Sequence, residues 1–422
     1  MKYYTIEEYL LIALARFVDA ELEKADYNTK LEAMKGFKLN WLKKPDAMLE
    51  EPEFNNLRNM YIDCKERGGT GRLLPADQHI SGLQDQSLWL HDHKALKRFG
   101  LYENGRKDIY KYLHDSFKEL ARRFKFRKEI LDMSRKEFKK YIIPLFYNGE
   151  HKLKELLTEA EFNRFMDFYG WVFPLAEQFR AQSLAVWKED VFFDAWELPD
   201  GYQVRAPHEA VSEAIGFDWS GYAFYGKCRK LSKIPQYTYF YNGDKIRNAG
   251  TFGLAANITH SLDGFAHREI KYRCSMTTAQ AGFILKECEK NGFSNSNPQH
   301  IKKIERIIDM ARKTGIVSAR LFYLLDGNPL VLPEDIHDYM KTMVTDFAEE
   351  ESFTPTSVHD EFSCNVRYMN ALRRIGNTVF ADIYSGHLQE YFNEVFGMTI
   401  KCEEPNEETF NAIRNWDYSL VI

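Results

Sequence analysis

Two aspartates in this chain follow short apolar segments and could bind a divalent cation. Asp77 comes directly after residues 73–76 (LLPA), and Asp360 lies within residues 357–362 (SVHDEF). A carboxylate at the end of a buried strand, or at the tip of a hairpin, is well placed to hold a hard cation such as Mg²⁺, which prefers oxygen ligands. Taken singly, however, an aspartate in such a place is more often a cap or a turn former.

A second group of residues recurs at steps of four. Arg135, Lys139, Ile143 and Tyr147 would lie along one side of a helix, drifting by about 40° per step at 3.6 residues per turn. Two cations and a phenol on one face suit a triphosphate and its sugar, because Arg binds phosphate bidentately and Lys is a point charge that can also donate a proton. A basic solvent-exposed face with an apolar edge is the alternative, and the pattern alone favours it.

Basic residues gather around this segment. The net charge of −5 argues against indiscriminate nucleic-acid binding over the whole surface, but it leaves room for a local basic groove. The basic residues between positions 122 and 140 are Arg122, Arg123, Lys125, Arg127, Lys128, Arg135, Lys136, Lys139 and Lys140, against Glu129, Asp132 and Glu137. We expect contacts with a polyanion to concentrate there, and a solvated helical face is the alternative.

The elements that must position these residues can be inferred from local patterns. Thr5 with Glu8 predicts a capping box at the start of an amphipathic helix that runs to about Lys24. Residues 82–200 show helical periodicity. Asp85, one turn beyond Ser81, is interpreted as a charge on a helix surface, and a position near the active site is the alternative.

The second half of the chain begins differently. It is irregular and strand-like over residues 196–257, with 236–241 (QYTYFY) the clearest strand, and helical again over 276–350, with loops expected at 291–298 and 326–328. A short strand is expected through Ser357 and Val358. Many helices with a few widely separated strands predict an α+β protein whose sheet is assembled from distant segments.

Composition limits the class of protein. The 422 residues, 44% of them hydrophobic, allow one large domain or two to three lobes. No stretch approaches the roughly 18 apolar residues that a membrane span requires. The six cysteines have no close pairs, which favours reduced thiols in a cytosolic protein over a zinc site or a disulfide framework.

The order of these segments resembles the single-subunit RNA polymerases of bacteriophages and mitochondria, which are relatives of the family A DNA polymerases. Motif A of that family, an Asp followed by Ser-Gly-Leu/Ile-Gln, is matched by Asp77 and residues 81–84 (SGLQ). Motif C, His-Asp-Ser, is matched by His359 and Asp360, with Glu361 in place of Ser.

Motif B of the family, Arg-x3-Lys-x3-Met-x3-Tyr-Gly, is matched by Arg135, Lys139 and Tyr147. The departures are Ile143 for Met, Asn148 for Gly, and Pro144, which we expect to bend the helix at about residues 140–144. A further family element, His-x-x-Asp-Gly, is matched by residues 260–264 (HSLDG).

The resemblance implies the palm and fingers of a right-hand polymerase: an α+β fold with a small antiparallel palm sheet surrounded by many helices, and with the thumb and N-terminal domain absent. It implies five regions. These are 1–95, N-terminal helices and a palm segment with motif A; 96–200, fingers with motif B; 201–265, a palm segment with the His-x-x-Asp-Gly element; 266–350, a mainly helical insertion; and 351–422, the palm hairpin with motif C and an aromatic C-terminal foot.

The resemblance also implies roles for individual residues. Asp77, Asp360 and the backbone near Gln78 would hold two magnesium ions, and Arg135 and Lys139 would bind the triphosphate, with Lys139 as proton donor to pyrophosphate. Tyr147 and His260 would sense the ribose 2′-hydroxyl. The residues expected to contact nucleic acid are Gln84, His359, Arg122, Arg123 and Lys140.

Family members carry several hundred residues before motif A, whereas here only 76 residues precede Asp77. We therefore expect the catalytic chain of a split enzyme, similar to the larger chain of the two-chain RNA polymerase of certain podoviruses. A second, smaller chain would carry the thumb and upstream palm. The other expected partners are a DNA template, nascent RNA and ribonucleoside triphosphates, in the cytoplasm of an infected bacterial host.

Two other functions stay open. The His-Asp-Glu form of motif C is that of a family A-like DNA polymerase, although the SGLQ and HSLDG segments are typical of the RNA polymerases. A non-catalytic nucleic-acid-binding protein could keep these motifs as relics, but Asp77, Lys139 and Asp360 are all intact, and a relic need not keep them.

Overall fold

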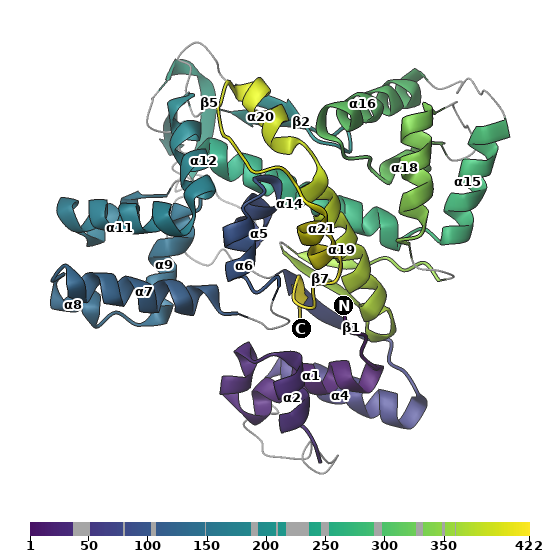
Figure 1. Ribbon diagram of the computed structural model, residues 1–422, viewed down its shortest axis with the longest axis horizontal. Coiled ribbons are helices and arrows are strands. Elements are labelled where there is room, and N and C mark those ends of the chain that lie inside the picture. The colour runs from purple at the N-terminus through teal and green to yellow at the C-terminus, as the bar shows by residue number, and fades with distance from the viewer. Residues whose placement is uncertain are drawn as a thin grey trace, which may run out of the picture.

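The computed structural model describes residues 1–36, 51–78, 81–102, 107–147, 149–186, 193–207, 210–216, 236–245, 253–290, 298–325, 332–347, 351–358 and 360–422. In this part of the chain many helices surround a small antiparallel sheet, so the predicted α+β class is confirmed. The sheet lies centrally in Figure 1, with groups of helices on three sides of it. No helix among these residues is long and apolar enough to cross a bilayer.

The central sheet has four strands in the order β6-β7-β1-β8, and each neighbouring pair is antiparallel. The strands are β1 (Leu73–Gln78), β6 (Thr356–Val358), β7 (Glu361–Asn365) and β8 (Leu420–Val421). The strands expected after residue 72 and through Ser357 are therefore confirmed, and β1 is two residues longer than predicted. Because side chains alternate along β1, Leu74, Ala76 and Gln78 are buried, while Asp77 lies on the opposite face, open to solvent but with its carboxyl partly enclosed by the protein.

An N-terminal group of helices lies beside this sheet (Figure 1). It comprises α1 (Ile6–Val18), the 3₁₀ helix η1 (Ala20–Lys24), α2 (Tyr27–Ala33) and α4 (Pro52–Arg67). The capping box of Thr5 and Glu8 is present, as predicted. The helix ends at Val18, earlier than predicted, because Asp19 is extended and its carboxylate accepts a hydrogen bond from the Glu21 N–H to begin η1.

A second group of helices projects from the other side of the sheet (Figure 1). It comprises α5 (Ser81–Trp89), α6 (His93–Arg98), α7 (Ile109–Arg123), α8 (Lys128–Leu131), α9 (Arg135–Leu145), α10 (His151–Leu156), α11 (Glu159–Val172) and α12 (Pro174–Ala185). Ser134 and Glu137 form a capping box at the start of α9. The helix ends one residue after Pro144, whose missing N–H removes a hydrogen bond from the ladder.

Two hairpins follow, β2 (Phe193–Glu197) with β3 (Gln203–Pro207) and β4 (Ala210–Gly216) with β5 (Gln236–Lys245). The strand expected at 236–241 is confirmed within β5. The strand-like region was expected to reach residue 257, and this is wrong, because α14 (Gly253–Cys274) begins before that point. The apolar residues of α14 pack at helical spacing into the main core, which decides the local structure.

Helices α15 (Thr278–Lys290), α16 (Pro298–Thr314), α17 (Arg320–Leu325) and α18 (Glu334–Val344) confirm the helical character expected for residues 276–350. Their apolar side chains form a hydrophobic cluster separate from the main core. The loop expected at 326–328 lies outside the described residues. So does the loop expected at 291–298, except for Pro298, which begins α16. A buried ion-pair group joins this helical unit to the rest, since Arg273 contacts Glu269 and Asp382, and Glu269 accepts from Ser318.

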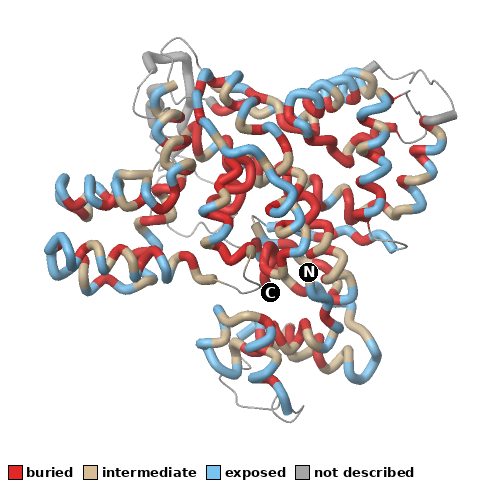
Figure 2. Tube along the Cα trace, viewed as in Figure 1, coloured by how far each residue is buried: buried red, intermediate tan, exposed pale blue. Residues whose placement is uncertain are grey.

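The C-terminal part contains the 3₁₀ helix η4 (Val366–Tyr368), α19 (Met369–Ser385), α20 (Leu388–Phe396) and α21 (Glu407–Arg414). Figure 2 shows that buried positions concentrate along α5 and where α14 and α19 cross the middle of the molecule. The main core thus includes the buried face of the central sheet together with residues of α5, α14 and α19.

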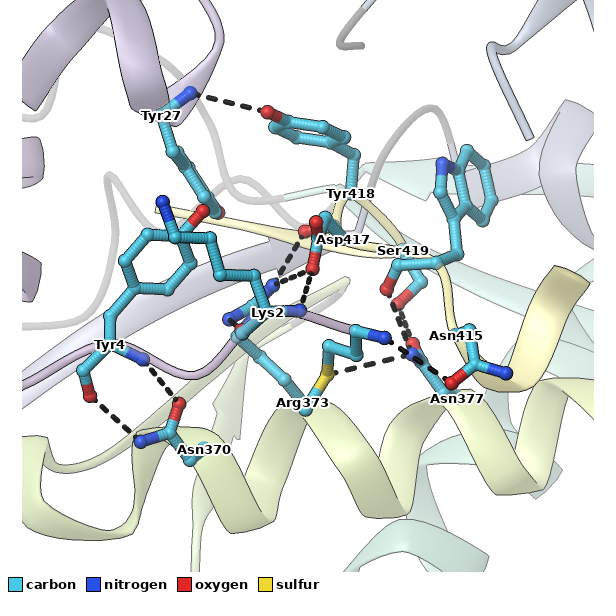
Figure 3. A network of polar contacts seen from close by, with 12 residues as sticks. Lys2, Tyr4, Tyr27, Asn370, Arg373, Asn377, Asn415, Asp417, Tyr418 and Ser419 are labelled. Carbon is cyan, nitrogen blue, oxygen red and sulfur yellow. Dashed lines mark hydrogen bonds and ion pairs between the residues drawn. The ribbon is translucent and has the colours of Figure 1, made fainter. Parts of the chain in front are cut away.

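Arg373 of α19 joins the two ends of the chain (Figure 3). Its guanidinium is 1% exposed, donates to the backbone carbonyls of Lys2 and Asp417, and lies 5.4 Å from the ring centroid of Tyr4. Asn370 of the same helix exchanges hydrogen bonds with the backbone of Tyr4. These contacts hold the N-terminal helices against the tail that carries β8.

Candidate functional site

A cavity of about 910 Å³ lies between the central sheet, α9 and the N-terminal helices. Six residues predicted for the site from the sequence line it: Asp77, Gln78, Arg135, Lys139, Tyr147 and Asp360. They come from β1, from the turn before β7, and from α9 with the turn that follows it. Three segments that are far apart in the sequence therefore meet at one cavity, in the combination that the sequence predicted.

The two aspartates are held together by the pairing of β1 with β7. Asp77 lies opposite Glu361, and the N–H of Gln78 donates a hydrogen bond of 2.9 Å to the carbonyl of Asp360. Burial raises the pKa of the Asp77 carboxyl to about 6, and the negative charges of Asp360 and Glu361 raise it further. The mutual repulsion of these carboxylates makes the position favourable for a cation.

The donor set fits a hard, hydrated cation. Among the described residues no group of three or more His, Cys, Asp or Glu side chains converges as a metal cage. A cation at Asp77 and Asp360 would therefore complete its shell with water, substrate oxygens or backbone carbonyls. Mg²⁺ is commonly bound in this way, by one or two carboxylates together with phosphate oxygens.

A buried polar group lies beneath the aspartates. The side-chain amide of Gln78 donates a hydrogen bond of 2.6 Å to Asp85 of α5, and Asp85 is 3% exposed. The expectation that Asp85 is a surface charge is therefore wrong, because the residues of α5 from Gly82 onward are buried. Burial, followed by the charge of Asp263, raises the pKa of Asp85 well above its ordinary value. Asp263 also lies 3.4 Å from His267, whose ring packs on Phe362 of β7.

The cations of α9 lie on the side of the cavity opposite the aspartates' strand. Arg135 pairs with Asp108 at 2.6 Å, and its Nε is buried with no hydrogen-bond partner in the part of the chain that is described. Lys139 lies 4.6 Å from the ring centroid of Tyr110. Burial, and then the charges of Lys24 and Arg135, lower the pKa of Lys139. An anion placed between these cations would relieve their repulsion.

Tyr147 lines the cavity and stacks on His260, which is not one of the residues lining it. Their rings stack with centroids 5.0 Å apart and planes 10° from parallel, although one follows α9 and the other belongs to α14. The Tyr147 ring also lies against the backbone of Gly82, where a Cβ atom would meet the ring carbon Cζ at 2.8 Å. Gly82 is the glycine of the SGLQ segment, so its lack of a side chain has a local reason.

Other predicted residues lie elsewhere. Gln84 is fully buried in α5, and neither atom of its amide has a hydrogen-bond partner within the described ranges. Arg122, Arg123 and Lys140 are exposed and do not line the cavity. His359 lies outside the described residues. The nucleic-acid contacts expected of these five residues stay predictions.

The N-terminal helices supply another wall of the cavity, which no pattern in the sequence predicted. Lys24 of η1 lines the cavity, and its charge acts on Asp77, Asp108 and Lys139. Lys30 of α2 also lines it and donates to the carbonyl of Ile422. The sequence predicts only an amphipathic helix here, because a lysine at the end of a helical pattern has no feature that distinguishes it from a solvated charge.

Neither a scan against models of known protein families nor a search of curated proteins finds a match to this chain.

Proposed function

We propose that this chain is the catalytic subunit of a template-directed, DNA-dependent RNA polymerase that uses two magnesium ions. One observation carries the proposal: Asp77 of motif A, Arg135, Lys139 and Tyr147 of motif B, and Asp360 of motif C all line one cavity. In this proposal the central sheet is the floor of the palm, and α7 to α12 are the fingers.

The two aspartates would hold the metal ions. Bound magnesium supplies the positive charge that activates the attacking 3′-hydroxyl and stabilises the departing pyrophosphate. Asp77 has to be ionised to bind a cation, and because its pKa is about 6, protons compete with metal in mildly acidic solution. The hydrogen bond from Gln78 to the Asp360 carbonyl keeps both carboxylates at the same end of the sheet.

The cations of α9 would bind the triphosphate. Arg135 lines the cavity, and its guanidinium can donate to a phosphate oxygen while its Nη2 stays on Asp108. Burial, and then the neighbouring cations, lower the pKa of Lys139, which makes it a better proton donor to the leaving pyrophosphate than an ordinary lysine. Lys24 faces the same space and adds positive charge from the N-terminal helices.

Tyr147 and His260 would select ribose over deoxyribose. A site built to hydrogen-bond a hydroxyl discriminates strongly against the analogue that lacks it. We therefore expect Tyr147→Phe to keep polymerase activity and to lower the preference for ribonucleotides by about tenfold. The ratio of kcat/KM for a ribonucleotide and its 2′-deoxy analogue measures this, and an unchanged ratio would refute the assignment.

The decisive experiment is magnesium-dependent extension of an RNA primer on a single-stranded DNA template, with and without a candidate smaller chain. Ribonucleotides and deoxyribonucleotides are compared, so that an RNA polymerase is distinguished from a family A-like DNA polymerase. Asp77→Asn and Asp360→Asn should each lower the rate about 1000-fold, since charge stabilisation by metal contributes several kcal/mol. Full activity in either variant contradicts the proposal.

A second measurement separates an inactive subunit from a non-catalytic protein. The chain alone should bind a ribonucleoside triphosphate only with Mg²⁺, and Asp360→Asn and Lys139→Ala should each weaken that binding by calorimetry. The proposed partner, a smaller chain with the thumb and upstream palm, would dock on α1 or on the helical unit α15–α18. Retained binding of that chain after both are deleted would exclude this part of the proposal.

A further inference from the structure

Gln86 of α5 is a buried amide that bonds both to the turn after α9, which lines the cavity, and to α14 beside it. It is 1% exposed. Its Nε2 donates one hydrogen bond of 3.0 Å to the carbonyl of Phe146 and another of 3.1 Å to Oγ1 of Thr259. Phe146 directly precedes Tyr147, and Thr259 directly precedes His260. A single NH₂ group therefore contacts the residue before each member of the stacked pair.

The chemistry of the two acceptors fixes the direction of these bonds. The Thr259 hydroxyl donates its own proton to the carbonyl of Ala255 at 2.8 Å, so it can only accept from Gln86. The Phe146 carbonyl is likewise an acceptor. Both protons of the Gln86 amide are thus in use, and no residue without two donors on one nitrogen can replace it in this geometry.

The two hydrogen bonds of Gln86 matter because Tyr147 lies beyond the regular part of its helix. α9 ends at Leu145, and the N–H groups of Phe146 and Tyr147 bond to Ile143 and Pro144 in a tighter turn. His260 is on a separate element, α14. The parallel stack of the two rings therefore depends on how α9 and α14 are placed relative to α5, and Gln86 is the side chain that bonds to both.

We propose that Gln86 is a positioning residue for sugar selection, which sets the spacing of Tyr147 and His260 and through it the preference for ribonucleotides. The inference rests on the proposed function. It differs from a purely structural role, in which loss of Gln86 would lower stability and all activities together. A positioning role requires the ratio between ribo- and deoxyribonucleotide incorporation to fall.

The test compares two variants and a matched control. Gln86→Met keeps an unbranched side chain but removes both donors, and Thr259→Val removes one acceptor while keeping the shape. Thr314→Val is the control, because Thr314 is also buried and its hydroxyl also donates to the carbonyl four residues earlier, at 2.7 Å to Met310, but it lies in α16. The kcat/KM ratio of a ribonucleotide to its 2′-deoxy analogue is measured for each, together with the melting temperature.

We expect Gln86→Met to lower the ratio about tenfold, Thr259→Val to lower it less, and Thr314→Val to leave it at the wild-type value. Should Gln86→Met fail to fold, Thr259→Val decides alone. The inference is overturned if Tyr147→Phe changes the ratio and neither Gln86→Met nor Thr259→Val does, or if Thr314→Val changes it as much. A wild-type chain that makes no polymer, alone or with its partner, overturns the proposed function and this inference with it.

Discussion

The two halves of the candidate site are built in different ways. Asp77 and Asp360 come from distant parts of the chain, and the backbone pairing of β1 with β7 brings them together. Arg135, Lys139 and Tyr147 come from one short segment, but contacts with residues of other elements set their positions: Asp108, Gly82 and Gln86. Strand register is hard to change with one substitution, whereas a side-chain contact is easy to change. We therefore expect single substitutions of supporting residues to impair the helical half more than the carboxylate half.

Gly82→Ala gives the largest effect that we expect from such a change. The new Cβ would meet the Tyr147 ring at 2.8 Å from Cζ, so the ring has to move away from its stack with His260. A misplacement of about 1 Å in the residues that position a substrate can lower a rate about 100-fold. We expect kcat/KM for ribonucleotides to fall by about that factor in primer extension.

Gly282→Ala is the matched control for this substitution. Gly282 is also within a helix, α15, and a Cβ there has no atom within 4 Å. It should keep the wild-type rate. If Gly82→Ala has no more effect than Gly282→Ala, the Tyr147 ring can adjust to the added methyl group. The position of Tyr147 would then not depend on its contact with Gly82.

The sequence predicted the members of both halves better than it predicted their supports. Asp77, Lys139 and Asp360 could be identified because their residue types and their order along the chain carry the chemistry. Asp85 was misjudged for a physical reason: a polar run such as residues 84–87 (QDQS) has no apolar stripe, so nothing in it reveals that α12, α14 and α19 cover it. Burial of this kind is a property of the tertiary structure.

Contacts between elements were the other part that the sequence could not supply. Lys24 and Asp108 face the site only because the N-terminal helices and α7 fold around it, and neither belongs to a motif. The end of the first helix at Val18 depends on one extended aspartate, Asp19, which looks like any acidic residue in a helical pattern. Element types were therefore predicted well, and boundaries and neighbours were not.

The support of the carboxylate half can be tested through pH. Burial and Asp263 raise the pKa of Asp85 in the folded chain above its unfolded value, so the folded state retains a proton that the unfolded state releases. The stability that this provides is complete below the ordinary pKa of an aspartate and is lost as pH rises towards the folded value. Asp85→Asn keeps an acceptor for Gln78 and has no proton to lose. From about pH 5 to about pH 9, we expect the melting temperature of the wild type to fall relative to this variant by about 2–4 °C.

Asp115→Asn is the control for this pH series. Asp115 is exposed, and its hydrogen bond with Lys111 lowers its pKa, so it is ionised in both states across this range. The melting temperature of Asp115→Asn should change with pH in the same way as that of the wild type. If the melting temperature of Asp85→Asn also changes with pH as that of the wild type does, then Asp85 carries no proton in the folded chain. The residue beneath Asp77 and Asp360 would then be a charged carboxylate and not a neutral one.

Lys24→Gln should lower kcat/KM least among these substitutions, and it tests a charge that acts on both halves of the site. The positive charge of Lys24 lowers the pKa of Asp77 in one half and of Lys139 in the other. Its side chain is 48% exposed, and exposed charges contribute only about 0.5–1 kcal/mol, so we expect kcat/KM to fall about three- to fivefold. The decrease should shrink at high salt, because ions screen exposed charges. Lys35→Gln, which removes an exposed lysine paired with Glu32 away from the cavity, should have no such effect. A decrease that is equal in the two variants, or unchanged by salt, would show that the N-terminal helices contribute shape to the site and not charge.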